Sequence, residues 1–162
     1  INSLTIPVKV MIRPKDGDFI YSKKDITKMR SEIDFCKSIG VGEVVFGVLN
    51  KNGQVDIDLT HLLAKEALPM KVTFHKAIDD TIDIILELKR LSKVKEVTSI
   101  LTSGGKDSAL NGQDTIKQII TEFSSRFNII SAGGITDINF DLVHNSIKGT
   151  EYHGKRIVGQ LG

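Results

Sequence analysis

Apolar positions along the chain form six short runs, which alternate with longer segments of helical spacing. β-Branched and aromatic residues are frequent in these runs, and all but the last two units place polar or glycine residues at the carboxyl end of the strand, a pattern typical of buried strands followed by loops. We therefore predict six strands, most of them followed by a helix. The runs are VKVMIR (8–13), EVVFGVL (43–49), KVTFHKA (71–77), SILTSGG (99–105), NIISAGGI (128–135) and TEYHG (150–154).

The segments between the runs carry apolar residues at spacings of three and four, as amphipathic helices do. Ser22 and Asp25 form an S-x-x-D start for the first helix, and Gly40 can end it. Asp58 is predicted to cap the second helix and Thr136 the last one. The positions expected on helices are Ile26, Met29, Ile33, Cys36 and Ile39, then Leu59, Leu62 and Leu63, then Ile84, Ile85, Leu88 and Leu91, then Ile116, Ile119, Ile120 and Phe123, and finally Ile138, Leu142 and Val143.

Strands that alternate with helices pair in parallel and are joined by right-handed crossovers. An open doubly wound sheet and a closed barrel both fit this alternation. No G-x-G-x-x-G motif follows the first strand, so we favour the α/β fold of a (β/α)8 TIM-type barrel. Such a barrel takes about 250 residues. We therefore expect residues 1–162 to be a single partial TIM-barrel domain that lacks about two N-terminal βα units and the C-terminal closing segment.

Composition and charge exclude several classes of protein. Apolar residues make up 40% and charged residues 26%, as in globular domains rather than disordered chains. The 22 Lys and Arg are interspersed with 20 Asp and Glu, so we predict no nucleic-acid partner. No apolar stretch approaches the roughly 20 residues of a membrane span, and we expect neither a membrane partner nor a secretory signal. The single cysteine, Cys36, excludes an internal disulfide and favours a reducing compartment.

Several blocks of sequence resemble, in order and spacing, the CutC copper homeostasis family. They are VMIRPKDGDFIYS (10–22), VVFGVL (44–49), VTFHKAID (72–79), ILTSGG (100–105) and AGGIT (132–136), and the similarity runs from about Pro7 to His153.

The resemblance implies a cytoplasmic TIM barrel associated with copper, Cu(I), binding or tolerance, in a family whose members are often dimeric. It also implies two further βα units before the M-I-R-P strand, which carry the cysteine and acidic residues most often linked to copper.

Strand alternation separates the side chains into a face toward the helices and a face toward the barrel interior. His75 ends the third run and Phe74 precedes it, so we expect Phe74 under a helix and His75 at the mouth of the barrel. The other side chains expected to face the interior are Lys9, Met11, Arg13 and Thr73, and Glu151 and His153 share one face.

Three of these residues are candidates for catalysis. His75 is a candidate general acid/base, and packing in the core is its alternative role. Arg13 can bind a carboxylate or phosphate with its planar guanidinium, or form an ion pair with Glu151 instead. Glu151 is the third candidate, as an acid near His75 that would raise the pKa of the ring, whereas Arg13 would lower it.

Two glycine-containing strand ends are candidates for anion binding, because exposed backbone N–H groups and hydroxyls favour anions there. They are Thr102, Ser103 and Gly104 in TSGG, and Gly133 and Gly134 in AGGI. Close packing of a strand end against a helix also requires glycine, so both interpretations stay open.

Soft ligands for copper are scarce in this sequence. Cu(I) prefers thiolate and thioether donors and then imidazole. Cys36 falls on the apolar side of its helix, where a thiol packs as a small hydrophobe. His75 and His153 are weak metal candidates, and no H-x-x-x-H, C-x-x-C or M-x-x-M pair occurs. Copper as cofactor therefore rests on the family resemblance alone.

Three functions are compatible with this pattern. The first is a CutC-like role in copper homeostasis, with a copper ion as partner. The alternative is a TIM-barrel enzyme that acts on a small anionic molecule, phosphorylated or carboxylated, with His75 as acid/base. A non-catalytic protein that acts through assembly, with a homodimer as one form, is the third, and the fold alone cannot choose among them.

Overall fold

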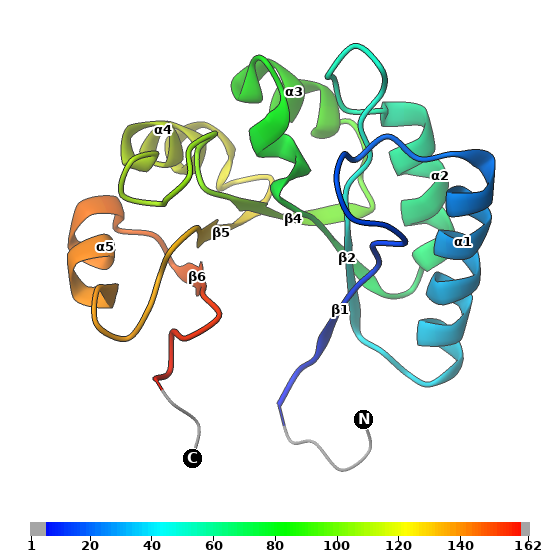
Figure 1. Cartoon of the computed structure of the whole chain (residues 1–162), viewed down its shortest axis with the longest axis horizontal. Coiled ribbons are helices and arrows are strands. Elements are labelled where there is room, and N and C mark those ends of the chain that lie inside the picture. Colours follow the sequence, from blue (N-terminus) through cyan, green and yellow to red (C-terminus); the bar gives the residue numbers. More distant parts are fainter. Residues whose placement is uncertain (1–5, 160–162) are drawn as a thin grey trace.

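A computed structural model describes residues 6–159 of the chain. Its sheet has six strands in the order β1-β2-β3-β4-β5-β6, and every neighbouring pair is parallel. Figure 1 shows that the sheet curls into an arc, with β1 and β6 at its two ends. The prediction of parallel strands in sequence order is confirmed, because a doubly wound sheet would reverse its strand order near the centre. The strands are β1 Lys9–Met11, β2 Glu43–Phe46, β3 Lys71–Phe74, β4 Val97–Thr102, β5 Asn128–Ala132 and β6 Glu151–His153.

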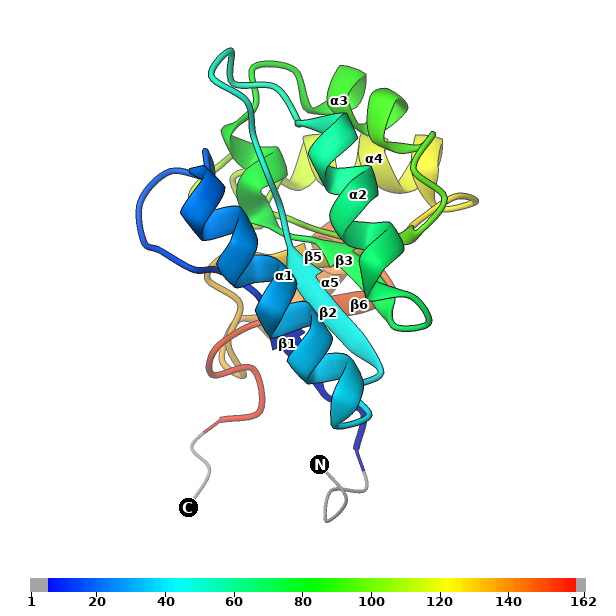
Figure 2. The same cartoon turned by 90° about the vertical axis from the view of Figure 1, so that its right-hand side faces the viewer.

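The helices lie along the outer, convex side of this arc, as the two views in Figures 1 and 2 show. A right-handed crossover from one parallel strand to the next places each helix on the same side of a curled sheet. The result is a curled half-barrel with a helical outer layer. The helices are α1 Lys23–Ser38, α2 Ile57–Ala67, α3 Ile84–Leu91, α4 Gln113–Phe123 and α5 Phe140–Ile147, together with the 3-10 helix η1 Lys76–Asp80.

The main hydrophobic core lies between the convex face of the sheet and the helices. Phe46 and Phe74 are 0% exposed there, which confirms that Phe74 points toward the helices. Met29, Ile33 and Cys36 of α1 pack into the same core. The cysteine is 4% exposed and therefore packs as the small buried hydrophobe that its position predicts.

The first helix begins and ends as its sequence predicts. The Ser22 side chain accepts a hydrogen bond from the Asp25 N–H, and the Asp25 carboxylate accepts one from the Ser22 N–H, which completes a capping box. The helix ends at Ser38, two residues before Gly40, which has a φ of +76°. Glycine is suited to this position because a left-handed backbone costs it nothing.

Two predicted caps were wrong. Asp56, not Asp58, caps α2 by accepting a hydrogen bond from the Leu59 N–H, and Asp58 lies in the first turn of the helix. Thr136 does not cap α5, which begins four residues later at Phe140. The Asn139 side chain instead accepts from the Thr136 N–H and donates to the Gly134 carbonyl, and so forms a turn where the sequence suggested helix.

No helix among residues 6–159 is both long enough and apolar enough to cross a membrane.

Candidate functional site

The carboxyl ends of the strands form a cleft of about 670 Å³. Parallel strands bring their carboxyl ends to one edge of the sheet, so segments far apart in sequence meet there. We call this hollow the carboxyl-end cleft. It is lined chiefly by Arg13 and Phe19 after β1, by Lys76, Asp79 and Asp80 in η1, and by Lys106 after β4.

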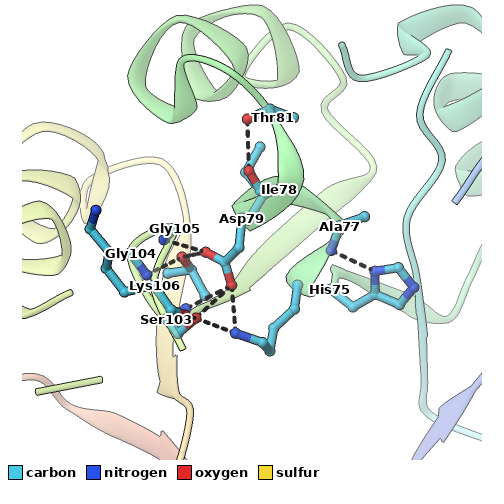
Figure 3. Close-up of polar contacts among 11 residues, drawn as sticks. His75, Ala77, Ile78, Asp79, Thr81, Ser103, Gly104, Gly105 and Lys106 are labelled. Carbon is cyan, nitrogen blue, oxygen red and sulfur yellow. Dashed lines mark hydrogen bonds and ion pairs between the residues drawn. The ribbon is translucent and has the colours of Figure 1, made fainter. Parts of the chain in front are cut away.

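One carboxylate, that of Asp79, holds η1 against the loop after β4 (Figure 3). It accepts hydrogen bonds from the Ser103 N–H at 2.9 Å, the Gly105 N–H at 3.0 Å and the hydroxyls of Ser103 and Thr102. The Lys76 ammonium lies 2.8 Å from the same carboxylate. The Asp79 side chain is only 6% exposed, so these bonds replace its lost hydration. We call Asp79, Lys76, Thr102, Ser103 and Gly105 the Asp79 cluster.

The predicted anion-binding residues after β4 therefore already hold an anion, which belongs to the chain itself. The donors of Thr102 and Ser103 point at Asp79, and the Gly104 N–H donates to the Thr102 hydroxyl. Their hydroxyls and N–H groups bind a carboxylate within the chain. Binding of an external anion at these residues stays a prediction.

One of the two glycines after β5, Gly133, has a packing role. A Cβ on Gly133 would lie 2.9 Å from the Ser103 Cβ and 3.1 Å from the Ala109 nitrogen. The Gly133 carbonyl accepts a hydrogen bond from that same N–H of Ala109. Gly134, by contrast, is exposed and has only the Ser108 side chain nearby. The close approach of two strand-end loops is thus one reason for glycine at position 133.

His75 lies at the carboxyl end of β3, but its ring is enclosed. It is 3% exposed, and its ring centroid is 4.8 Å from that of Phe19 and 6.2 Å from that of Phe74. The expectation that the ring lines the mouth of the barrel is not met, because His75 does not line the carboxyl-end cleft. A Cβ on Gly47 would lie 2.6 Å from the His75 Nδ1, so only glycine leaves room for this ring.

The same enclosure fixes the protonation of His75. Burial, with a smaller contribution from the positive charge of Arg13, lowers the pKa of the ring from 6.5 to about 4. The Ala77 N–H donates to Nδ1, so the neutral ring carries its proton on Nε2. That Nε2 is buried and has no hydrogen-bond partner among residues 6–159. General acid/base catalysis by His75 stays a prediction.

Arg13 lies beside Phe19, which brings it near His75. Its guanidinium carbon is 4.6 Å from the centre of the Phe19 ring, and Nη2 donates to the Gly17 carbonyl at 2.8 Å. The alternative ion pair with Glu151 does not form. Glu151 lies instead 3.8 Å from the Lys9 ammonium, so the three catalytic candidates do not meet at one site.

A second hollow lies on the concave face of the sheet and has a volume of about 430 Å³. Lys9 and Met11 line it, as does Thr73, which confirms that these side chains face the interior. Glu151 and His153 line it as well. We call this hollow the concave cavity. It holds the most accessible sulfur atom of residues 6–159, that of Met11, which is 51% exposed, whereas Cys36 is buried.

No complete metal site is visible in the described part of the chain. Among residues 6–159, no group of three or more His, Cys, Asp or Glu side chains could hold a metal ion. Burial raises the pKa of the Cys36 thiol, which disfavours the thiolate that a soft metal prefers. Of the two weak metal candidates, His153 is exposed and His75 is buried.

Sequence reasoning missed the residue that organises the carboxyl-end cleft, which is Asp79. Asp79 and Asp80 are adjacent and chemically identical, and only the turn of η1 directs the first toward the loop after β4. Phe19 was also missed, although it directly follows a proline- and glycine-containing stretch, residues 14–18, that predicts a loop. An aromatic residue in such a loop indicates local packing, and Phe19 is 8% exposed.

Comparison with known proteins gives a consistent result. The model of the CutC family matches residues 1–158. The mouse copper homeostasis protein cutC homolog is 38% identical over 151 residues, which cover 93% of this chain and 55% of the mouse protein. A family protein CutC from Glaesserella parasuis is 36% identical over 149 residues, covering 92% of this chain and 61% of that protein.

The fold comparison agrees with the sequence comparison. A crystal structure of a CutC protein from Streptococcus agalactiae superposes with a TM-score of 0.87 at 26% identity. The match covers 94% of this chain and 74% of that chain. The chain spans 55 and 61% of the length of the two curated relatives described above.

Proposed function

Because the chain belongs to the CutC family, we propose that the protein containing it serves copper homeostasis, the role that the name of its mouse relative states. The observation that carries this proposal is the family match over residues 1–158. The curled parallel sheet supports it, since a CutC protein has the same arrangement of strands and helices. A cytoplasmic location and a homodimer remain predictions from the family.

We further propose that residues 1–162 form one partial domain of a (β/α)8 barrel. The two end strands of the sheet, β1 and β6, each have one strand neighbour, and the concave face beside them is accessible. Two more βα units preceding β1 would close an eight-stranded barrel and cover this face. The half-exposed Met11 supports the proposal, because a barrel interior is normally a packed layer of side chains.

In this proposal, the copper ion binds at the concave cavity, and side chains that line this cavity are its ligands from this chain. Met11 offers a thioether there and His153 an imidazole, both donors that suit Cu(I). Residues 6–159 do not by themselves supply a complete donor set, so further ligands come from outside them. Cys36 and His75 take no part, because both are buried outside this cavity.

A Cu(I) titration against a colorimetric chelator tests this proposal on the full-length protein. We expect His153→Gln and Met11→Leu each to weaken Cu(I) binding, while Cys36→Ser lowers stability but leaves the number of bound copper ions unchanged. A fall in copper stoichiometry for folded Cys36→Ser would contradict the assignment of the cavity. Copper tolerance of cells that lack their own CutC protein, with and without this one, tests the role in homeostasis itself.

A further inference from the structure

We propose that the carboxyl-end cleft binds the oxyanion group of a small molecule, a carboxylate or a phosphate, with Arg13 as its main ligand. This site is separate from the concave cavity, with which it shares none of its lining residues. Its volume of about 670 Å³ is within the range of small-molecule sites, which is roughly 300 to 1,000 Å³.

Arg13 is held in place but is not neutralised. The face of Phe19 supports its guanidinium, and the Gly17 carbonyl accepts one of its five N–H donors. Phe19 is itself fixed, because it is 8% exposed and packs on the ring of His75. Among residues 6–159, Arg13 forms no ion pair with a carboxylate. An exposed guanidinium that two contacts orient and that has unused donors is suited to a bidentate oxyanion.

The acidic residues of the cleft leave Arg13 accessible to an anion. Asp79 is nearly enclosed, and its charge is shared among the Lys76 ammonium and the N–H and hydroxyl donors of the Asp79 cluster. Asp107 accepts a hydrogen bond from Asn111 at 2.8 Å, on its own loop. Asp80 is exposed to solvent, where its charge is screened.

The other two cations differ in what they can contribute. The Lys76 ammonium is already bound to Asp79 and Ser103, so it can add attraction but few new contacts. Lys106 is exposed, and Figure 3 shows that its ammonium points away from the Asp79 cluster. The lining thus contains three cations and three carboxylates, and it is the geometry of Arg13, not net charge, that selects the anion.

Calorimetric titrations with inorganic phosphate and with succinate test this proposal in copper-free buffer at constant ionic strength. The two probes separate a phosphate ligand from a carboxylate ligand, and saturable binding of either supports the site. We expect Arg13→Gln to weaken binding about ten-fold or more, as the loss of one charge-assisted hydrogen bond predicts. Arg13→Lys keeps the charge but not the planar fork, and we expect it to weaken binding nearly as much.

Lys15→Gln is the matched control. It removes one positive charge from the same loop, outside the cleft, where Lys15 is paired with Asp18 at 2.7 Å. We expect it to change affinity by less than about two-fold, and melting temperatures show that each variant is folded. The proposal is overturned if neither probe binds saturably, if Arg13→Gln binds as the unchanged protein does, or if Lys15→Gln weakens binding equally. Copper plays no part in these measurements, so the copper proposal is tested independently.

Discussion

The two faces of the curled sheet differ sharply in how they are packed. On the convex face, the aromatic rings of Phe46 and Phe74 are completely buried beneath the helices. On the concave face, Met11 is half-exposed, and the buried apolar cluster found there among residues 6–159 is small and consists of Leu101, Ile130 and Ala132. The chain therefore stabilises its fold from one side of the sheet and leaves the other side accessible.

This difference separates the residues that hold the fold from those available for binding. Burial of apolar area stabilises by about 25 cal/mol per Å², so the convex core carries most of the stability of the segment. Side chains on the concave face and around the carboxyl-end cleft contribute less. They can be substituted to test binding without loss of the fold. Substitutions on the two faces should therefore change stability by different amounts.

The largest expected effect is on the convex face. Phe74→Ala removes a fully buried ring and should lower the free energy of unfolding by about 3 to 5 kcal/mol. Met11→Ala, at the last residue of β1, should cost less than about 1 kcal/mol because Met11 is already 51% exposed. Urea unfolding measures both changes. Equal losses would show that the concave face is as tightly packed as the convex one.

The second effect concerns the carboxyl end, where the two faces meet. Asp79→Asn removes the charge that the Asp79 cluster binds, and we expect a loss of about 2 kcal/mol. The neighbouring Asp80→Asn is the control and should change stability by less than about 0.5 kcal/mol, because Asp80 is exposed. If both variants unfold at the same urea concentration as the unchanged protein, the cluster does not stabilise the loop after β4.

The third effect depends on pH, through His75. This residue directly follows β3 and is buried nearly as deeply as the convex core. Its pKa of about 4 in the folded state is below the ordinary 6.5, so the unfolded chain takes up a proton first as the pH falls. The stability contributed by the neutral ring is therefore complete above about pH 6.5 and decreases progressively until the pH reaches about 4.

Between pH 7 and pH 5, the loss assigned to His75 is about 2 kcal/mol. His75→Gln cannot titrate, so its stability should fall by that much less over the same interval when both proteins are unfolded in urea. A pH dependence that His75→Gln leaves unchanged would mean that the ring is solvated rather than enclosed.

Much of the fold could be predicted because its strongest signals are local. Periodicity gave the strands and helices, and their alternation implied the parallel order that the sheet has. Strand alternation also placed Lys9, Met11 and Thr73 on the concave face and Phe74 beneath a helix. These predictions hold because within a strand the direction of a side chain follows from its position alone.

The candidate site was predicted less well because it lies beyond the strand ends. Once β3 ends at Phe74, the backbone turns into η1, and alternation no longer tells where His75 points. Which charged side chains pair with one another likewise depends on the three-dimensional structure, and alternation along a strand does not reveal it. Alternation predicted that Arg13 and Glu151 both face the barrel interior, but each has other neighbours, Phe19 for the arginine and Lys9 for the glutamate.

The smallest effect is expected for an ion pair on the concave face. Its strength tests whether that face is as accessible as the structure indicates. Lys9 lies on β1 and Glu151 on β6, the two end strands of the sheet. The Lys9 ammonium is 3.8 Å from the Glu151 carboxylate, and the two side chains are 37% and 44% exposed. An ion pair so exposed should contribute about 0.5 kcal/mol or less and should weaken further in 1 M salt. A double-mutant cycle with Lys9→Gln and Glu151→Gln measures this coupling.

The same cycle in the full-length protein sharpens the comparison. Lys9 also lies 3.1 Å from Glu43, so the single Lys9→Gln variant removes two attractions and only the cycle isolates the one to Glu151. If further strands cover the concave face there, water is excluded and the coupling should rise above about 1 kcal/mol and lose much of its dependence on salt. A coupling that stays small in the full-length protein would show that this face remains open to solvent and would contradict the proposed closure of the barrel around Lys9 and Glu151.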